Sequence, residues 1–399
     1  MNPAPEVSRL ANGVRVVSLH QPGRASAAAA IAWGGGAHAE GAGEAGLAHL
    51  AEHLLFPDDP DDLAAFDAMG GRVNAWSNHE YSVFHAHTSM ARLSEAIGRL
   101  SRRLALGTDV VIEDDFQRER EAIRRERFAE GDTALEQAHA RCLGRPPPCP
   151  PADTLAHATP EALRRFIARE LRGDALCVGV AGDLTHAEAV AACAALGELP
   201  TSTNASTATD SALHWRSGLR EALADGGPPG LLWLMPAPRR GTTEASALAL
   251  AERALCGGLS APLFRTLRAR GLAYGLHSMR DERGTGGYWA LQVVCLPAMA
   301  TAVAGIVETT LNAATSGLAP DMLAAAWSAL ACESLLAGDD PAMCAEHLAL
   351  SGLLGTPSAP APPARPAPDA VRAALANAWA RHARFVTGAA PALSRQAPT

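Results

Sequence analysis

Residues 46–56, "GLAHLAEHLLF", place His49, Glu52 and His53 within five positions of an otherwise apolar stretch. The leucines of this stretch recur at helical spacing, which predicts a helix with one buried face. On a helix, positions i and i+4 lie on the same side, so both imidazoles can reach one ion. The stretch therefore predicts either a metal site or a buried helix with polar side chains at its rim.

Zinc is the metal that this combination of residues favours. Imidazole nitrogen is a good zinc ligand, and Glu52 lies near enough to His49 and His53 to activate water at the metal without binding it. The spacing H-x-x-E-H is one of the motifs of zinc peptidases, that of the inverzincins. The chain has fourteen histidines. A chance match is therefore expected in roughly a few per cent of such chains, and the buried-helix alternative stays open.

A catalytic zinc needs a third protein ligand and one open position. Residues 114–131, "DDFQREREAIRRERFAEG", predict a helix on which Glu119 and Glu126 are seven residues apart and share a face. One of them could bind the metal while the other orients a ligand. Glu130, one turn beyond Glu126, is a rival third ligand. Glu and Arg alternate densely here, so a solvated, salt-bridged helix is the alternative interpretation.

The composition is that of a globular protein, with 48% hydrophobic and 19% charged residues. The formal net charge of −8 argues against nucleic acid as a partner, because a basic surface is expected there. The eight cysteines form no C-x-x-C pair, so neither a thiolate zinc site nor a disulfide framework is predicted. We find no secretory signal and no apolar run long enough for a membrane span. The expectation is a cytoplasmic protein without membrane contact.

The order of the expected elements predicts two halves of similar α+β design. In the first half, strands are expected over 6–33 (with a turn at Asn12-Gly13), 70–88 and 174–185, and helices over 44–56, 89–106, 113–131, 159–173 and 186–199. In the second half, strands are expected over 230–238 and 287–297, and helices over 242–258 and 370–385. A small, polar, turn-rich stretch at 200–212 looks like a linker. The predicted domains are therefore 1–199 and 213–399.

Several separate pieces of the chain resemble the pitrilysin, insulin-degrading enzyme and mitochondrial processing peptidase family. They occur in the family's order: "LANGVRVV" (10–17), "GLAHLAEHLLF" (46–56), "GGRVNAWS" (70–77), "REREAIRRE" (118–126) and "SAPLFRTLRARGLAYGL" (260–276). The resemblance covers residues 8 to about 276, and together the pieces are far more specific than the H-x-x-E-H spacing alone.

The resemblance implies a role for each matched residue. It makes His49, His53 and Glu126 the zinc ligands, Glu52 the general base and Glu119 an acid that assists a ligand. It places the substrate on an edge strand made of Asn74, Ala75, Trp76 and Ser77. It also implies that Arg268 and Tyr274 hold the substrate carbonyl and the oxyanion, with Arg265 or Arg270 as alternatives to Arg268.

The resemblance also implies the fold and the assembly. Each half is expected to be an antiparallel-rich mixed sheet covered by helices, and the chain to be half of a four-domain clamshell that encloses a chamber. A homodimer, or a heterodimer with a related chain, would complete the chamber. The implied activity is zinc-dependent peptide hydrolysis, with a ribosomally made precursor peptide as substrate, as in the pyrroloquinoline quinone biosynthesis branch. General oligopeptide degradation, or a non-catalytic substrate-binding subunit, are the alternatives.

Overall fold

The computed structural model describes residues 4–56, 60–130, 133–144, 155–201, 214–223 and 227–388, and of residues 127–130 and 133 the backbone alone. The predicted linker at 200–212 falls almost wholly outside the described residues. The chain divides into two compact units, each built from three segments. Unit 1 comprises Met1–Glu126, Pro150–Ser206 and Glu333–Ala361, and unit 2 comprises Arg127–Cys149, Thr207–Cys332 and Pro362–Thr399.

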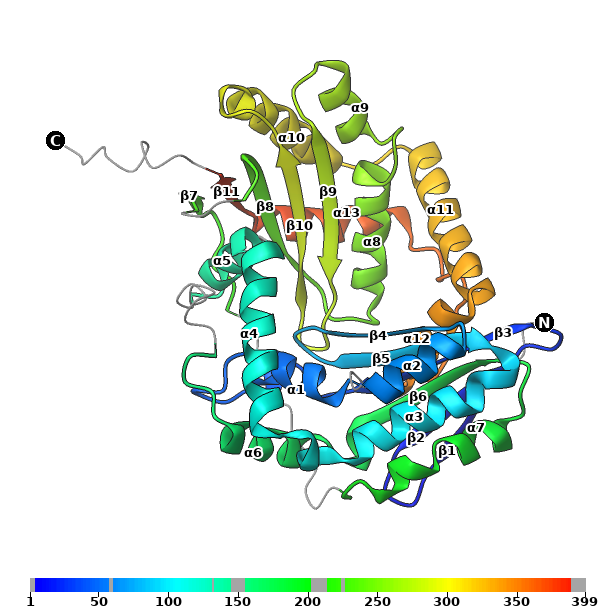
Figure 1. The fold of residues 1–399 in the computed structure, drawn as a ribbon. Coiled ribbons are helices and arrows are strands. Elements are labelled where there is room, and N and C mark those ends of the chain that lie inside the picture. Colours follow the sequence, from blue (N-terminus) through cyan, green and yellow to red (C-terminus); the bar gives the residue numbers. More distant parts are fainter. Residues whose placement is uncertain are drawn as a thin grey trace. The chain divides into compact units, whose positions relative to one another are not determined.

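Unit 1 is built on a six-stranded mixed sheet in the order β1-β2-β6-β3-β5-β4 (Figure 1). Its strands are β1 (Glu6–Arg9), β2 (Arg15–His20), β3 (Ser26–Trp33), β4 (Arg72–Ser77), β5 (Ser82–Ser89) and β6 (Leu176–Gly182). Only the pair β2–β6 is parallel. The turn between β1 and β2 follows the predicted Asn12-Gly13, where Gly13 has a φ of +99° that favours glycine. The strand β4 lies at one edge of the sheet.

Helices cover both faces of this sheet. They are α1 (Leu47–Leu55), α2 (Pro60–Ala68), α3 (Leu93–Ala105), α4 (Glu113–Glu130, up to Glu126 in this unit), α6 (Pro160–Glu170), α7 (His186–Ala192) and α12 (Pro341–Leu353). The larger core lies on the face that α1, α3 and α6 cover. The other face packs against α12, whose Ala345, Leu348 and Ala349 contact a separate apolar cluster. A helix from late in the sequence therefore completes the first unit.

Unit 2 repeats the design with a five-stranded sheet in the order β7-β11-β8-β10-β9. Its strands are β7 (Arg220–Ala222), β8 (Gly230–Ala237), β9 (Gly275–Asp281), β10 (Gly287–Val294) and β11 (Ala383–Thr387). One face packs on α8 (Thr243–Cys256), α9 (Pro262–Ala269), α10 (Ala300–Ala314) and α13 (Pro368–Ala380), and the other on α5 (Thr133–Cys142). The helix α11 (Pro320–Asp339) runs from unit 2 into unit 1.

The predicted fold class is confirmed: α+β, with two similar parts that each contain a mostly antiparallel mixed sheet covered by helices. The C-terminal end of the last predicted helix is wrong. The expected helix over 370–385 ends at Ala380, and residues 383–387 form β11, because their backbone pairs with β8 and β7. No helix among the described residues is long and apolar enough to span a bilayer.

Candidate metal centre

The residue that precedes α1, Gly46, occupies a position where a larger residue would be strained. Gly46 has a φ of +88°, and a Cβ added there would lie 2.7 Å from Cδ2 of Leu155. The side chain of Glu40 accepts a hydrogen bond of 2.9 Å from the backbone N–H of Ala48, one of the donors left open in the first turn. Sequence reasoning missed Glu40, because nothing in the local pattern pairs a residue with the helix eight positions on.

The two histidines lie on the partly exposed side of α1. Every other residue of the helix is buried, whereas the side chains of His49 and His53 are 27% and 21% exposed. Their Nε2 atoms lie 3.2 Å apart. The i, i+4 spacing therefore brings both imidazoles to one point, as the sequence pattern predicts.

The helix α4 supplies a carboxylate at the same point, from its residue Glu126. Oε2 of Glu126 lies 3.5 Å from Nε2 of His49 and 3.5 Å from Nε2 of His53. Among the described residues, these three form the one group of acid, histidine or cysteine side chains close enough together to hold an ion. Glu130, the rival third ligand, has its side chain outside the described residues.

The donor set fits zinc. Two imidazole nitrogens and one carboxylate oxygen are zinc ligands, and in a tetrahedron with bonds of about 2.1 Å the ligand atoms are roughly 3.4 Å apart. The three separations found here, 3.2, 3.5 and 3.5 Å, agree with that value. Three protein ligands would leave the fourth position for water or substrate, which is the arrangement of catalytic rather than structural sites.

Glu119 contacts the imidazole of His53 on the side away from His49 and Glu126. Its Oε2 lies 3.0 Å from Nδ1 of His53, while its Oε1 accepts a hydrogen bond of 2.8 Å from Arg118. A proton on Nδ1 donated to Glu119 leaves Nε2 of His53 with a lone pair for a metal. The two glutamates seven residues apart thus contact opposite nitrogens of the same ring.

Glu52 is the buried acid of the cluster. It is 7% exposed, and its Oε2 lies 3.8 Å from Nε2 of His49. The pKa of Glu52 is raised to about 7: burial raises it most, His53 lowers it, and the negative charge of Glu126 raises it. A carboxyl group with a pKa near neutrality can both take and return a proton at physiological pH.

The residues expected to bind substrate lie on the edge strand β4. Asn74 is exposed, and Ala75, Trp76 and Ser77 are half-buried. Ala75 packs on the core that contains α1, whereas Trp76 points to the opposite face and stacks edge-on with Tyr81. The strand pairs with β5 on one side, and no described strand pairs with its other side.

Arg268 and Tyr274 belong to unit 2. Arg268, at the end of α9, lies over the ring of Phe264, and Arg265 and Arg270 are exposed as well. Tyr274 is 78% exposed and precedes β9. The roles that the resemblance gives to these residues stay predictions.

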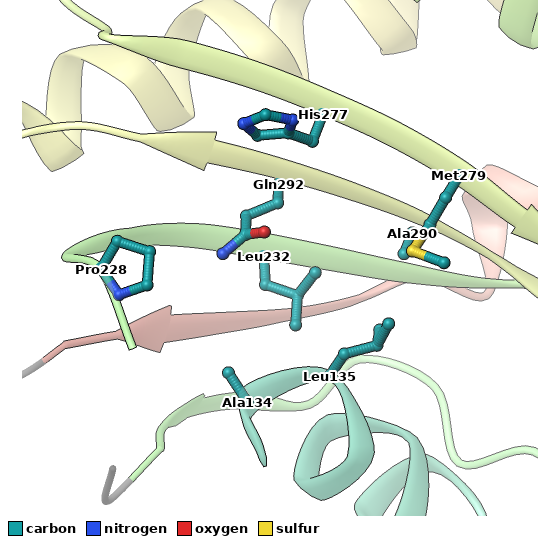
Figure 2. Close-up of a pocket in the computed structure, with 8 residues that line it drawn as sticks. All are labelled: Ala134, Leu135, Pro228, Leu232, His277, Met279, Ala290 and Gln292. Carbon is teal, nitrogen blue, oxygen red and sulfur yellow. The ribbon is translucent and has the colours of Figure 1, made fainter. Parts of the chain in front are cut away.

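Unit 2 also contains a small, mostly apolar pocket of about 70 Å³ between its sheet and α5 (Figure 2). The polar side chains in its lining are His277 and Gln292, which lie opposite each other on β9 and β10. The remaining lining residues are Ala134, Leu135, Pro228, Leu232, Met279 and Ala290. The lining offers neither an acid nor a second histidine, so this pocket has no catalytic or metal-binding constellation of its own.

Comparison with known proteins identifies the family. A family model described as "Insulinase (Peptidase family M16)" matches residues 15–142, and one described as "Peptidase M16 inactive domain" matches residues 157–330. An uncharacterised zinc protease of Mycobacterium tuberculosis is 30% identical over 321 residues, which are 74% of this chain and 71% of that protein. Coenzyme PQQ synthesis protein F of Klebsiella pneumoniae is 30% identical over 188 residues, 45% of this chain and 22% of that protein.

The fold agrees with these matches. The crystal structure of a protease from Helicobacter pylori superimposes with a TM-score of 0.83 and 17% identity, over 98% of this chain and 100% of that chain. The family-model matches and the relatives place the chain in the class of peptidase-like proteins, and its fold agrees with that class. The chain belongs to peptidase family M16, which confirms the resemblance found in the sequence.

Proposed function

We propose that this chain is a zinc-dependent endopeptidase of the inverzincin type. The observation that carries the proposal is the geometry of α1 and α4. The ligand atoms of His49, His53 and Glu126 lie 3.2–3.5 Å from one another, with the buried carboxyl of Glu52 beside them. The names of several relatives, which describe zinc proteases, are consistent with it.

Glu52 transfers the proton during the proposed hydrolysis. Bound zinc would supply a Lewis acid that polarises the scissile carbonyl and acidifies water. Glu52 takes a proton from the attacking water and passes it to the leaving amide nitrogen. Glu119 keeps His53 in the tautomer that exposes Nε2 to the metal.

Substrate would bind as an added strand on β4. The free edge of this strand offers backbone N–H and C=O groups, and main-chain hydrogen bonds of this kind give affinity without demanding a particular sequence. Asn74, Ala75, Trp76 and Ser77 form the strand's second half, and Trp76 offers a wall for one side-chain pocket.

A second chain completes the proposed enzyme. Arg268 and Tyr274 would hold the substrate carbonyl and the oxyanion, and a homodimer lets unit 2 of one subunit serve the other subunit's metal centre. A heterodimer with a related chain is the alternative. We further propose that the substrate is a ribosomally made precursor peptide, which the similarity to coenzyme PQQ synthesis protein F supports. General oligopeptide degradation is the alternative, and the location would be the cytoplasm.

The test is zinc content and peptide cleavage by the purified chain, with its mass in solution recorded. Glu52→Gln is expected to keep stoichiometric zinc and to lose about 10²–10⁴-fold in kcat, since that is the usual contribution of a general base. Glu121→Gln is the matched control, because Glu121 is 43% exposed on the same helix as Glu126 and pairs with Arg124. This control should retain activity.

The possible outcomes separate the hypotheses. A dimer with zinc and with activity that the Glu52 variant loses supports a self-sufficient peptidase. Zinc without activity in a monomer would point to a missing partner chain and to a substrate-binding subunit. A chain that binds no zinc would overturn the assignment of His49, His53 and Glu126.

A further inference from the structure

The side chains of four polar residues on the edge strand and its neighbour take no part in the proposed metal binding or proton transfer. The strands β4 and β5 pair so that Arg72 lies opposite His87 and Asn74 lies opposite His85. Directly opposed residues of antiparallel strands project from the same face, with their side chains within reach of one another. The four residues therefore form one patch, which we call the basic edge patch.

The basic edge patch lies on the α12 face of the sheet, beside the apolar cluster that packs under that helix. The next opposed pair along the two strands, Trp76 and Val83, belongs to the apolar cluster under α12. Val73 packs on the opposite core. The two β4 residues of the patch are exposed and its two histidines are half-buried, so a ligand can reach it.

Asn74 accepts a hydrogen bond of 3.0 Å from the backbone N–H of Ala75, but other polar groups of the patch have no partner in the described part of the chain. No described carboxylate pairs with Arg72, and Nδ1 of His85 is buried without a hydrogen-bond partner. In contrast, Arg99 of α3 lies 2.6 Å from Asp62. A buried polar atom without a partner costs free energy, so such an atom beside a free arginine indicates a place where a ligand supplies the missing acceptor.

We propose that the basic edge patch is a specificity subsite that binds a carboxylate of the peptide substrate. The inference rests on the proposed binding of substrate as a strand on β4. The guanidinium of Arg72 donates two parallel hydrogen bonds to a carboxylate, a geometry that few other groups match. His87, directly opposite on β5, adds an N–H donor from the inner side.

The position of the subsite also fixes a spacing in the substrate. Successive residues of a strand point to alternate faces, so an added strand presents every second side chain to the face of Arg72, Asn74 and Trp76. Arg72 and Trp76 are four residues apart. The preferred peptide therefore carries its carboxylate four residues from the side chain that faces Trp76, whether it adds parallel or antiparallel.

The experiment measures peptide binding, so that it does not depend on hydrolysis. Fluorescein-labelled peptides with blocked ends and with Phe and Glu four positions apart are titrated into the zinc-loaded full chain carrying Glu52→Gln. Matched peptides carry Gln or Arg in place of Glu, and one further peptide ends at that position with a free C-terminal carboxylate. We expect the Glu peptide to bind about tenfold tighter than the Gln peptide, as for an arginine–carboxylate pair. A preference for the C-terminal peptide instead would assign the subsite to the chain end.

The decisive variant is Arg72→Glu, which should abolish this preference and favour the Arg peptide. Arg9→Glu is the matched control. Arg9 is exposed on β1, at the opposite edge of the same sheet, and its reversal should leave the preference for Glu intact.

The outcomes distinguish the subsite from the proposed peptidase function. Peptide binding without a preference among Glu, Gln and Arg would overturn the subsite while leaving the proposed peptidase function standing. A preference that depends on Arg72, in a chain whose wild type binds peptide but does not hydrolyse it, would support the subsite and favour a substrate-binding subunit over a self-sufficient enzyme. The absence of any peptide binding would overturn both.

Discussion

Glu119 contacts Nδ1 of His53, the ring nitrogen that faces away from the candidate metal centre. Its hydrogen bond of 3.0 Å to Nδ1 fixes both the tautomer and the orientation of the imidazole. Groups of this kind affect metal binding through the ligand that they hold, without touching the metal.

We expect Glu119→Gln to weaken zinc binding by about 10–100-fold, the usual cost of losing such a partner. Competition with a chelator measures the affinity, and Glu121→Gln on the same helix provides the reference. Equal zinc affinity in the two variants would show that Glu119 has no part in positioning His53.

Burial of Glu52 predicts a pH-dependent stability of the metal-free protein. The pKa of Glu52 is raised to about 7 in the folded chain, above its ordinary value of 4.5. Below pH 4.5 the carboxyl group is protonated in both the folded and the unfolded state, so it does not lower the free energy of unfolding. As pH rises to 7 and beyond, the unfolded chain ionises first, and the folded chain is destabilised by about 1–3 kcal/mol.

Glu52→Gln removes the ionisable group and, with it, this loss of stability at high pH. The metal-free variant should therefore have a higher Tm than the metal-free wild type at pH 8, and the gap should close as pH falls toward 4.5. Thermal unfolding in the presence of a chelator across this range measures it. Two Tm curves that stay parallel from pH 4.5 to pH 8 would contradict the burial argument.

At the scale of the element, the start of α1 depends on Gly46. A side chain there meets two obstacles: the φ of +88° and the close approach of Leu155. Gly43 is a natural comparison, because its φ is +83° but a Cβ added there meets nothing within 4 Å.

We expect Gly46→Ala to lower the free energy of unfolding by about 1–3 kcal/mol more than Gly43→Ala, because only the first adds overpacking to backbone strain. Thermal unfolding of both variants measures the difference. The Gly46 variant should also bind zinc less tightly, since both histidines follow on the same helix. Equal losses in the two variants would mean that Leu155 moves aside.

The elements that the sequence predicts correctly carry their signals locally. The helix α1 lies within the predicted 44–56, and Thr159 caps α6 by accepting a hydrogen bond from the backbone N–H of Ala162. The first three residues of β11 were predicted as the end of a helix, because residues 383–387 become a strand only through pairing with β8 and β7. That pairing joins residues about 150 positions apart along the chain, a distance over which no local pattern carries information.

The same division applies to the candidate site. Helical spacing is enough to bring His49 and His53 together, since both lie on one element. The approach of Glu126 depends on how α4 packs against α1, which no spacing rule gives; only the family resemblance singled out Glu126. The basic edge patch depends on strand register, because Arg72 and His87 become neighbours only when β4 and β5 pair.

At the scale of the whole molecule, unit 1 cannot bury its sheet without α12. The face that carries Val17, Ala30 and Cys177 packs on this helix, and the approach is so close that a Cβ added at Gly179 would lie 2.0 Å from the backbone oxygen of Ala345. The helix is therefore part of the core of unit 1, although it begins at Pro341 and the preceding segment of that unit ends at Ser206.

We expect a fragment of residues 1–201 to lack cooperative unfolding and to bind a dye that reports exposed apolar surface. Adding a peptide of residues 333–361 should restore a cooperative transition and zinc binding. The same peptide with Leu348→Asp is the control and should restore neither, because Leu348 is fully buried against the sheet. A fragment that unfolds cooperatively by itself would show that α12 is dispensable.

The late position of α12 has a consequence for biosynthesis. All six strands of the first sheet are made before residue 183, yet the helix that covers one face ends at Leu353. At the usual rate of synthesis, roughly 10–30 s pass between these points. Throughout that time the apolar residues of this sheet face have no covering helix, so we expect the nascent chain to bind chaperones that recognise exposed apolar segments.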